Sequence, residues 1–178
     1  MTGPRAGRHH DGVIRFADVI ASAFLGAGLG VQIFLSFLVA PAAFRLVDRG
    51  LAVRLMEGLF PGYYGFGLVT SGLALVLGVA LAVRERGAPL RWGAVLLLSV
   101  VVLGTVYAGR FLLPEARAAR IRAQSAPAGD LGPLEFSRLH RRAVFVNIAL
   151  FGVGALALAL HAAASTVTTS ASPRDGRG

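Results

Sequence analysis

The chain has 178 residues, of which 55% are hydrophobic and only 15% are charged, and its net charge is +9. This composition excludes an ordinary water-soluble domain, and the absence of cysteine excludes disulfides, thiolate metal sites and cysteine nucleophiles. All eighteen basic residues are arginines, gathered near the ends of apolar stretches where side chains meet lipid phosphates, so we expect no nucleic-acid binding.

Four long stretches carry almost no charge, and each is close to the ~20 residues that a helix needs to cross a bilayer. The stretches are apolar on every side, unlike the helices of soluble proteins, and they lack the alternation of barrel strands. We therefore predict an all-α fold, an integral membrane four-helix bundle. Its predicted parts are a disordered tail at 1–17, a membrane domain at 18–164 with spans at about 19–44, 62–83, 92–113 and 143–164, and a disordered tail at 165–178.

The first span contains Gly26 and Gly30, which lie about one helical turn apart. Small residues at this spacing let another helix backbone approach closely. We expect ordinary packing within the bundle, with a homo-oligomer through the same two glycines as the alternative.

A short amphipathic helix is predicted in the link between the first and second spans. Phe44, Val47, Leu51 and Leu55 fall on one face of a helix over 45–60, while the arginines fall elsewhere. This pattern is typical of a helix that lies at the membrane interface. The alternative is a continuation of the first span into water.

The second link, at 84–91, is short, so the second and third spans are expected to be antiparallel neighbours. Tyr63, Tyr64 and Trp92 stand near span ends, and we expect their rings at the membrane interface. Pro114 is expected to kink or break the third span, because proline lacks the N–H that a helix needs.

The third link contains a predicted amphipathic helix at 115–123 and a predicted flexible loop at 125–132. An even number of spans places both termini on one side of the membrane, which then holds eight arginines against ten on the other side. The positive-inside rule favours the side with ten as cytoplasmic, and the bias is small.

Four polar residues are candidates for a functional pocket, because polar groups inside hydrocarbon are costly. They are expected to converge inside the bundle: Gln32 in the first span, Arg110 in the third, and His140 and Asn147 about two turns apart in the fourth. Each has a simpler alternative. The arginine can extend its side chain to the interface, the histidine can bind water or lipid there, and the two amides can hydrogen-bond between helices.

The histidines restrict the metal and haem chemistry of the chain. His140 and His161 are 21 residues apart, roughly 31 Å along a helix, so they cannot bind the same iron. His9 and His10 lie in the predicted tail, and a copper site lacks its usual soft ligands. We expect no metal site, with a single haem on His140 as the remaining alternative. Hydrolase and phosphate-loop motifs are absent, so no enzyme activity is expected.

Several short motifs resemble those of the transmembrane protein 205-like family, a bacterial domain of unknown function that is distantly similar to copper-resistance D proteins. The resemblance covers about 19–160, and the residues that carry it are Gly28, Gly30, Gln32, Pro41, Phe44, Phe60, Pro61, Tyr63, Arg110, Pro114, Phe136, His140 and Asn147. It implies a four-span protein without an established activity, expected in the bacterial plasma membrane.

Two functions are therefore expected as alternatives. The first is a non-enzymatic membrane protein, transporter-like or a scaffold component, with a polar pocket inside the bundle and no cofactor. The second is a haem-associated membrane oxidoreductase with His140 as the iron ligand.

Overall fold

The computed structural model describes residues 5–85, 88–125 and 132–170, and within them the fold is entirely helical. Two π-helical segments interrupt the α-helices, η1 (Phe34–Val39) and η2 (Ala108–Leu112). The α-helices are α1 (Arg5–Ile33), α2 (Ala40–Leu46), α3 (Arg49–Arg84), α4 (Pro89–Tyr107), α5 (Leu113–Ser125) and α6 (Gly132–Ser170).

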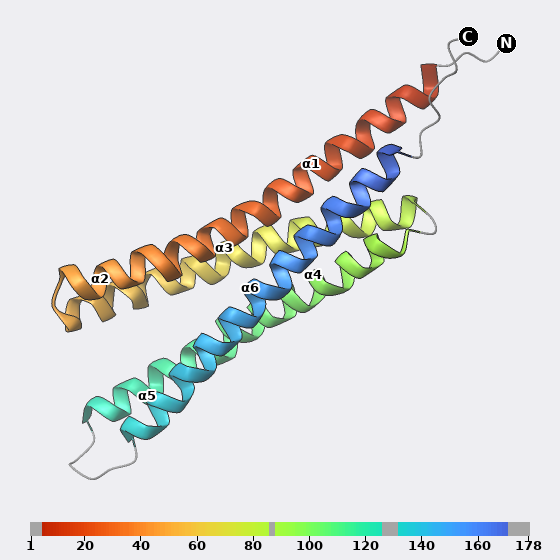
Figure 1. Ribbon diagram of the computed structural model, residues 1–178. Coiled ribbons are helices and arrows are strands. Elements are labelled where there is room, and N and C mark those ends of the chain that lie inside the picture. The colour runs from red at the N-terminus through yellow and green to blue at the C-terminus, as the bar shows by residue number, and fades with distance from the viewer. Residues whose placement is uncertain (1–4, 86–87, 126–131, 171–178) are drawn as a thin grey trace.

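These segments join into four long helical rods, because η1 connects α1 to α2 and η2 connects α4 to α5 without a break (Figure 1). Each rod is long and apolar enough to cross a membrane, with a mean hydropathy of 2.0 to 2.4 over its most apolar stretch. The predicted all-α four-helix fold with four spans is confirmed. The chain is a multi-pass membrane protein.

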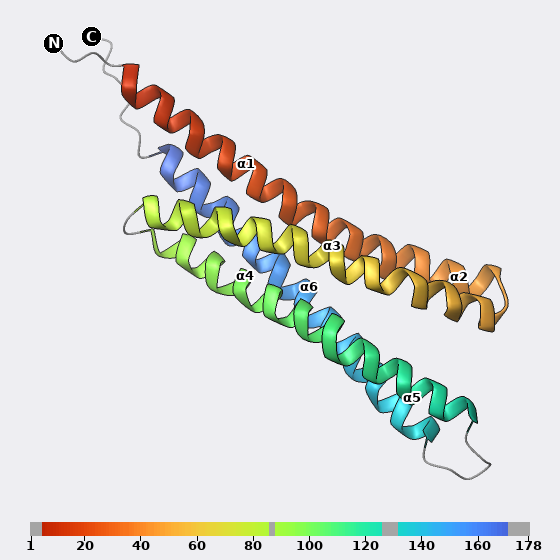
Figure 2. The ribbon, with the colours of Figure 1, turned by 180° about the vertical axis from the view of Figure 1, so that it is seen from behind.

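The rods pack as a ring in which α1 contacts α3 and α6, and α4 contacts α3 and α6. Each rod places one buried apolar residue in a central cluster, which we call the apolar layer: Leu25, Ala74, Leu98 and Ala157. The start of α1, the end of α3, the start of α4 and the end of α6 lie at one end of the bundle, which we call the terminal end (Figure 1). At the opposite end, the far end, the α2–α3 turn and the tip formed by α5 and α6 lie apart in both views (Figures 1 and 2).

The helices extend further at both chain ends than the sequence predicts. Residues 5–17 and 165–170 are helical and continue α1 and α6, because a helix elongates easily once its first turns exist. The remaining parts of the two predicted tails, and nearly all of the predicted loop at 125–132, lie outside the described residues.

The predicted interfacial helix at 45–60 is not a separate element. The chain turns at Val47, and Asp48 then caps α3 by accepting a hydrogen bond from the backbone N–H of Leu51 at 2.9 Å. From this cap, α3 continues without interruption through Pro61. The stretch at 115–123 is likewise part of α5, which continues the third rod.

Arg117 explains how α3 tolerates Pro61. A proline in a helix leaves the carbonyl four residues earlier, here that of Glu57, without its N–H donor. Arg117 Nη2 of α5 donates to this carbonyl at 2.5 Å, and Arg120 of the same helix forms an ion pair with the Glu57 carboxylate. The far end of α3 is therefore fixed by a neighbouring rod.

Two further prolines, Pro41 and Pro114, lie within the continuous rods, and each follows a π-helical turn. Pro41 lies in the first turn of α2 after η1, and Pro114 lies in the first turn of α5 after η2. A π turn widens the hydrogen-bonding pattern by one residue, which gives the proline ring room against the preceding carbonyls. The predicted kink or break at Pro114 is therefore a π turn within a continuous rod.

Close contact between α1 and α3 depends on Gly28. A Cβ at this position would lie 2.8 Å from Thr70 Oγ1 on α3. We predict that Gly28→Ala forces the two helices apart and lowers the free energy of unfolding by about 1–3 kcal/mol. Thermal unfolding of the purified protein in detergent measures this loss.

Gly72→Ala is the matched control, because a Cβ at Gly72 would meet nothing within 4 Å. Its melting temperature should equal or slightly exceed that of the wild type. Equal losses in both variants would contradict the close contact at Gly28.

Candidate functional site

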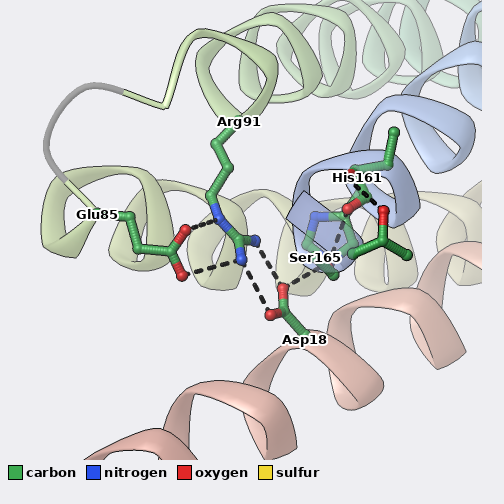
Figure 3. Close-up of polar contacts among 7 residues, drawn as sticks. Asp18, Glu85, Arg91, His161 and Ser165 are labelled. Carbon is green, nitrogen blue, oxygen red and sulfur yellow. Dashed lines mark hydrogen bonds and ion pairs between the residues drawn. The ribbon is translucent and has the colours of Figure 1, made fainter. Parts of the chain in front are cut away.

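Four ionisable side chains, one from each rod, meet at the terminal end of the bundle (Figure 3). We call them the ion cluster: Asp18 of α1, Glu85 directly after α3, Arg91 of α4 and His161 of α6. The guanidinium of Arg91 lies at its centre. Its Nη1 and Nη2 donate to the two carboxylate oxygens of Asp18 at 2.6 and 3.0 Å, and its Nε and Nη2 donate to those of Glu85 at 2.6 and 3.0 Å.

Two members of the ion cluster are almost completely buried. Arg91 is only 1% exposed and His161 only 2%. A buried arginine is tolerated only when its charge and most of its donors are matched, and two bidentate carboxylates accept four hydrogen bonds from Arg91. His161 Nε2 lies 3.3 Å from Asp18 Oδ1 and brings α6 to the same point. The cluster therefore ties all four rods together at one end.

Sequence reasoning missed this cluster. Arg91 stands at the edge of an apolar span and resembles a headgroup-binding arginine, and its partner Asp18 is 73 residues away. The available signal was that Asp18 and Arg91 each border a span that has few other charges.

A second polar group lies deeper in the bundle, around Asn147 of α6. Gln32 Nε2 of α1 donates to the backbone carbonyl of Asn147 at 2.8 Å. The Asn147 amide Nδ2 donates to Tyr64 Oη at 3.1 Å and to the Ala143 carbonyl at 3.0 Å. Tyr63 Oη donates to Asn147 Oδ1 at 3.3 Å.

These residues border a cavity of about 50 Å³ between α1, α3, α4 and α6. We call it the polar pocket. Its apolar wall includes Phe24, Phe66 and Val101. Its polar lining comes from Gln32, Tyr63, Tyr64, Thr70, Ser71, Thr105 and Asn147. None of the described residues that line it is charged.

The structure brings together only two of the four predicted pocket residues. Gln32 and Asn147 line the polar pocket and hydrogen-bond to each other. Arg110 lies in η2 and is exposed, and His140 is exposed with its ring 6.0 Å from that of Phe136. Neither lines the pocket. A functional role for any of the four stays a prediction.

The tyrosines occupy an unexpected place. Tyr63 and Tyr64 line the polar pocket, whereas the sequence predicts that their rings lie at the membrane interface. Their rings pack against each other and against Phe60, with centroids 4.9 to 6.4 Å apart. Only Trp92, which is 48% exposed near the start of α4, lies where an interfacial ring is expected.

On every rod, the residue that joins the ion cluster and a residue that lines the polar pocket are separated by the same number of positions. The residue pairs that join them are each 14 residues apart, close to four helical turns or roughly 21 Å, so both members lie on nearly the same helix face. The pairs are Asp18 and Gln32, Ser71 and Glu85, Arg91 and Thr105, and Asn147 and His161. The apolar layer lies between them: Leu25 is midway in sequence between Asp18 and Gln32, and Leu98 is midway between Arg91 and Thr105.

Among the residues that the structure describes, no three His, Cys, Asp or Glu side chains are placed so that they could hold a metal ion together. The alternative of a haem on His140 finds no support in its surroundings, because this histidine is exposed and lies outside the polar pocket. That alternative stays a prediction.

Comparison with known proteins identifies a family but no activity. Residues 23–125 match the family model described as a domain of unknown function, DUF4149. An uncharacterized protein of Aquifex aeolicus (strain VF5) is 41% identical over 61 residues, which cover 34% of this chain and 46% of the relative. The chain thus spans about half the length of that relative. No solved structure matches.

These matches confirm the expectation of a domain of unknown function. They do not show the likeness to the transmembrane protein 205-like family or to copper-resistance D proteins, which stays a prediction. The family-motif residues Pro41, Pro61 and Pro114 have the structural roles given above. Phe60 packs on the pocket tyrosines, and Phe44 is half exposed.

We predict that Arg91→Met strongly destabilises the bundle. Methionine fills similar space, but the buried carboxylate of Asp18 then loses the cation that compensates its charge. Breaking a buried charge pair in this way costs about 3–5 kcal/mol. Chemical unfolding in mixed micelles, followed by helical circular dichroism, measures the loss.

Arg138→Met serves as the control, because Arg138 is exposed on α6. The same substitution there should change stability by less than about 0.5 kcal/mol. If the two variants unfold alike, the ion cluster does not hold the terminal end.

Proposed function

The chain belongs to the DUF4149 family, and we propose that it is a transporter-like membrane protein that takes a small polar solute into the polar pocket. The observation that carries the proposal is the convergence of neutral polar side chains from all four rods on one cavity. Polar groups inside a membrane bundle are expensive and mark substrate pathways. The pocket's place between helices of a bundle is also typical of ligand sites.

The layered arrangement supports transport over simple binding. The pocket lies on the far-end side of the apolar layer, whose residues Leu98, Ala74 and Ala157 are fully buried. Apolar constrictions block polar solutes because water does not wet them. Beyond this layer, the ion cluster joins the four rods at the terminal end. In this conformation a solute would therefore reach the pocket from the side away from the apolar layer and the ion cluster.

A scaffold role is less well supported, because it depends on a partner. Gly26 and Gly30 leave open space on α1, where an added Cβ would meet nothing within 4 Å. A homo-oligomer through these glycines remains a proposal that cross-linking in membranes would test. We also propose the bacterial plasma membrane as the location, consistent with a bacterial relative.

Solute entry into proteoliposomes tests the proposed function. The full chain is reconstituted and mixed rapidly with urea, acetamide or glycerol, and light scattering follows vesicle re-swelling. We expect at least one of these solutes to enter several-fold faster than into protein-free vesicles. Ser71→Leu should abolish the difference, because the larger side chain fills the pocket.

Ser99→Leu is the matched control, since Ser99 bonds to the carbonyl of Val95 on α4 and does not line the pocket. It should retain the wild-type rate. Rates equal to those of empty vesicles for every solute, with the protein folded, would rule out the transport proposal.

A further inference from the structure

The serine and threonine hydroxyl groups of the polar pocket already donate their hydrogens to backbone carbonyls. Ser71 Oγ donates to the carbonyl of Gly67 at 2.7 Å, and Thr105 Oγ1 donates to that of Val101 at 2.8 Å. A hydroxyl carries one hydrogen and two lone pairs. Each of these oxygens can therefore offer an incoming solute only an acceptor.

The orientation of the two amides follows from their carbonyl partners. A backbone carbonyl only accepts, so the nitrogen of Asn147 must face Ala143, and that of Gln32 must face the carbonyl of Asn147. The second N–H of Asn147 then goes to Tyr64 Oη, and its Oδ1 accepts from Tyr63. Both amide hydrogens of Asn147 and the hydroxyl hydrogen of Tyr63 are thus committed.

Among the described lining residues, most of the unused hydrogen-bonding capacity consists of lone pairs. They belong to Gln32 Oε1, Thr70 Oγ1, Ser71 Oγ, Thr105 Oγ1 and Tyr63 Oη. The donors left are the Tyr64 hydroxyl and the second N–H of Gln32. Because no charged residue lines the pocket, an anion would find neither a counter-charge nor enough donors, and its desolvation would not be compensated.

We infer that the polar pocket recognises its solute through N–H or O–H donors of the solute and rejects solutes that offer only acceptors. This inference rests on the proposed function and adds the class of substrate. The cavity of about 50 Å³ sets the size. A water-sized group needs roughly 10–15 Å³ in this measure, so the solute has on the order of three to five non-hydrogen atoms. Short amides, amidines and amines fit both conditions.

Four probes with the same planar arrangement of four heavy atoms test the inference. Guanidinium and acetamide carry N–H donors, whereas acetone and acetate carry none. The full chain in lipid nanodiscs is mixed with acetamide, and saturation-transfer difference NMR detects its methyl signal against empty nanodiscs. Guanidinium chloride should displace acetamide at concentrations at least tenfold lower than acetone or sodium acetate, with sodium chloride as the ionic-strength control.

The outcomes separate this inference from the proposed function. Displacement by acetone or acetate as effective as that by guanidinium would overturn donor selectivity and leave a solute-binding pocket intact. Binding of none of the four probes would overturn both ideas. Displacement by guanidinium alone supports both.

Two substitutions then test the assigned acceptors. Thr105→Val keeps the shape of the side chain and Ser71→Ala removes one oxygen, so each should weaken acetamide binding several-fold without lowering the melting temperature. Ser99→Ala, outside the pocket, should leave acetamide binding unchanged. Unchanged binding in both pocket variants would overturn the assignment.

Discussion

The structure depends on one buried guanidinium. Arg91 can stay inside the bundle only while Asp18 and Glu85 both face it, and this requirement fixes α1, the end of α3 and α4 relative to one another. His161 adds α6 to the same point. Hydrophobic contacts alone would leave helices in lipid free to slide and rotate, because lipid tails are as apolar as the side chains. Directional charge pairing removes that freedom at the terminal end.

Away from this fixed end, the kind of side chains inside the bundle changes along its axis. The apolar layer follows the ion cluster, then the polar pocket, and finally two tips that lie apart (Figures 1 and 2). The four-turn spacing between the polar layers means that each rod turns the same face inward at both levels. The inward face of each rod therefore contributes residues to the ion cluster, to the apolar layer and to the polar pocket.

The fold was predictable because span length and the absence of charge act over whole segments, so errors at single residues do not matter. Helix ends were less predictable, since the cap at Asp48 and the donor that Arg117 gives to Glu57 are specific contacts. Sequence reasoning brought Gln32 and Asn147 to one pocket but placed Tyr63 and Tyr64 at the interface. The ion cluster was not predicted. The sequence around an arginine at the edge of a span is the same whether its side chain binds a lipid phosphate or a distant carboxylate.

The order of the ion cluster along the chain has a consequence for biosynthesis. Asp18 and Glu85 both leave the ribosome before Arg91, and His161 follows much later. The first rod is therefore made long before the arginine that pairs with its Asp18 carboxylate, just as the Glu57 carbonyl must wait for Arg117. Until α4 has been synthesised, the Asp18–Arg91 ion pair cannot form. The contacts that hold the first two rods are thus completed by the second half of the chain.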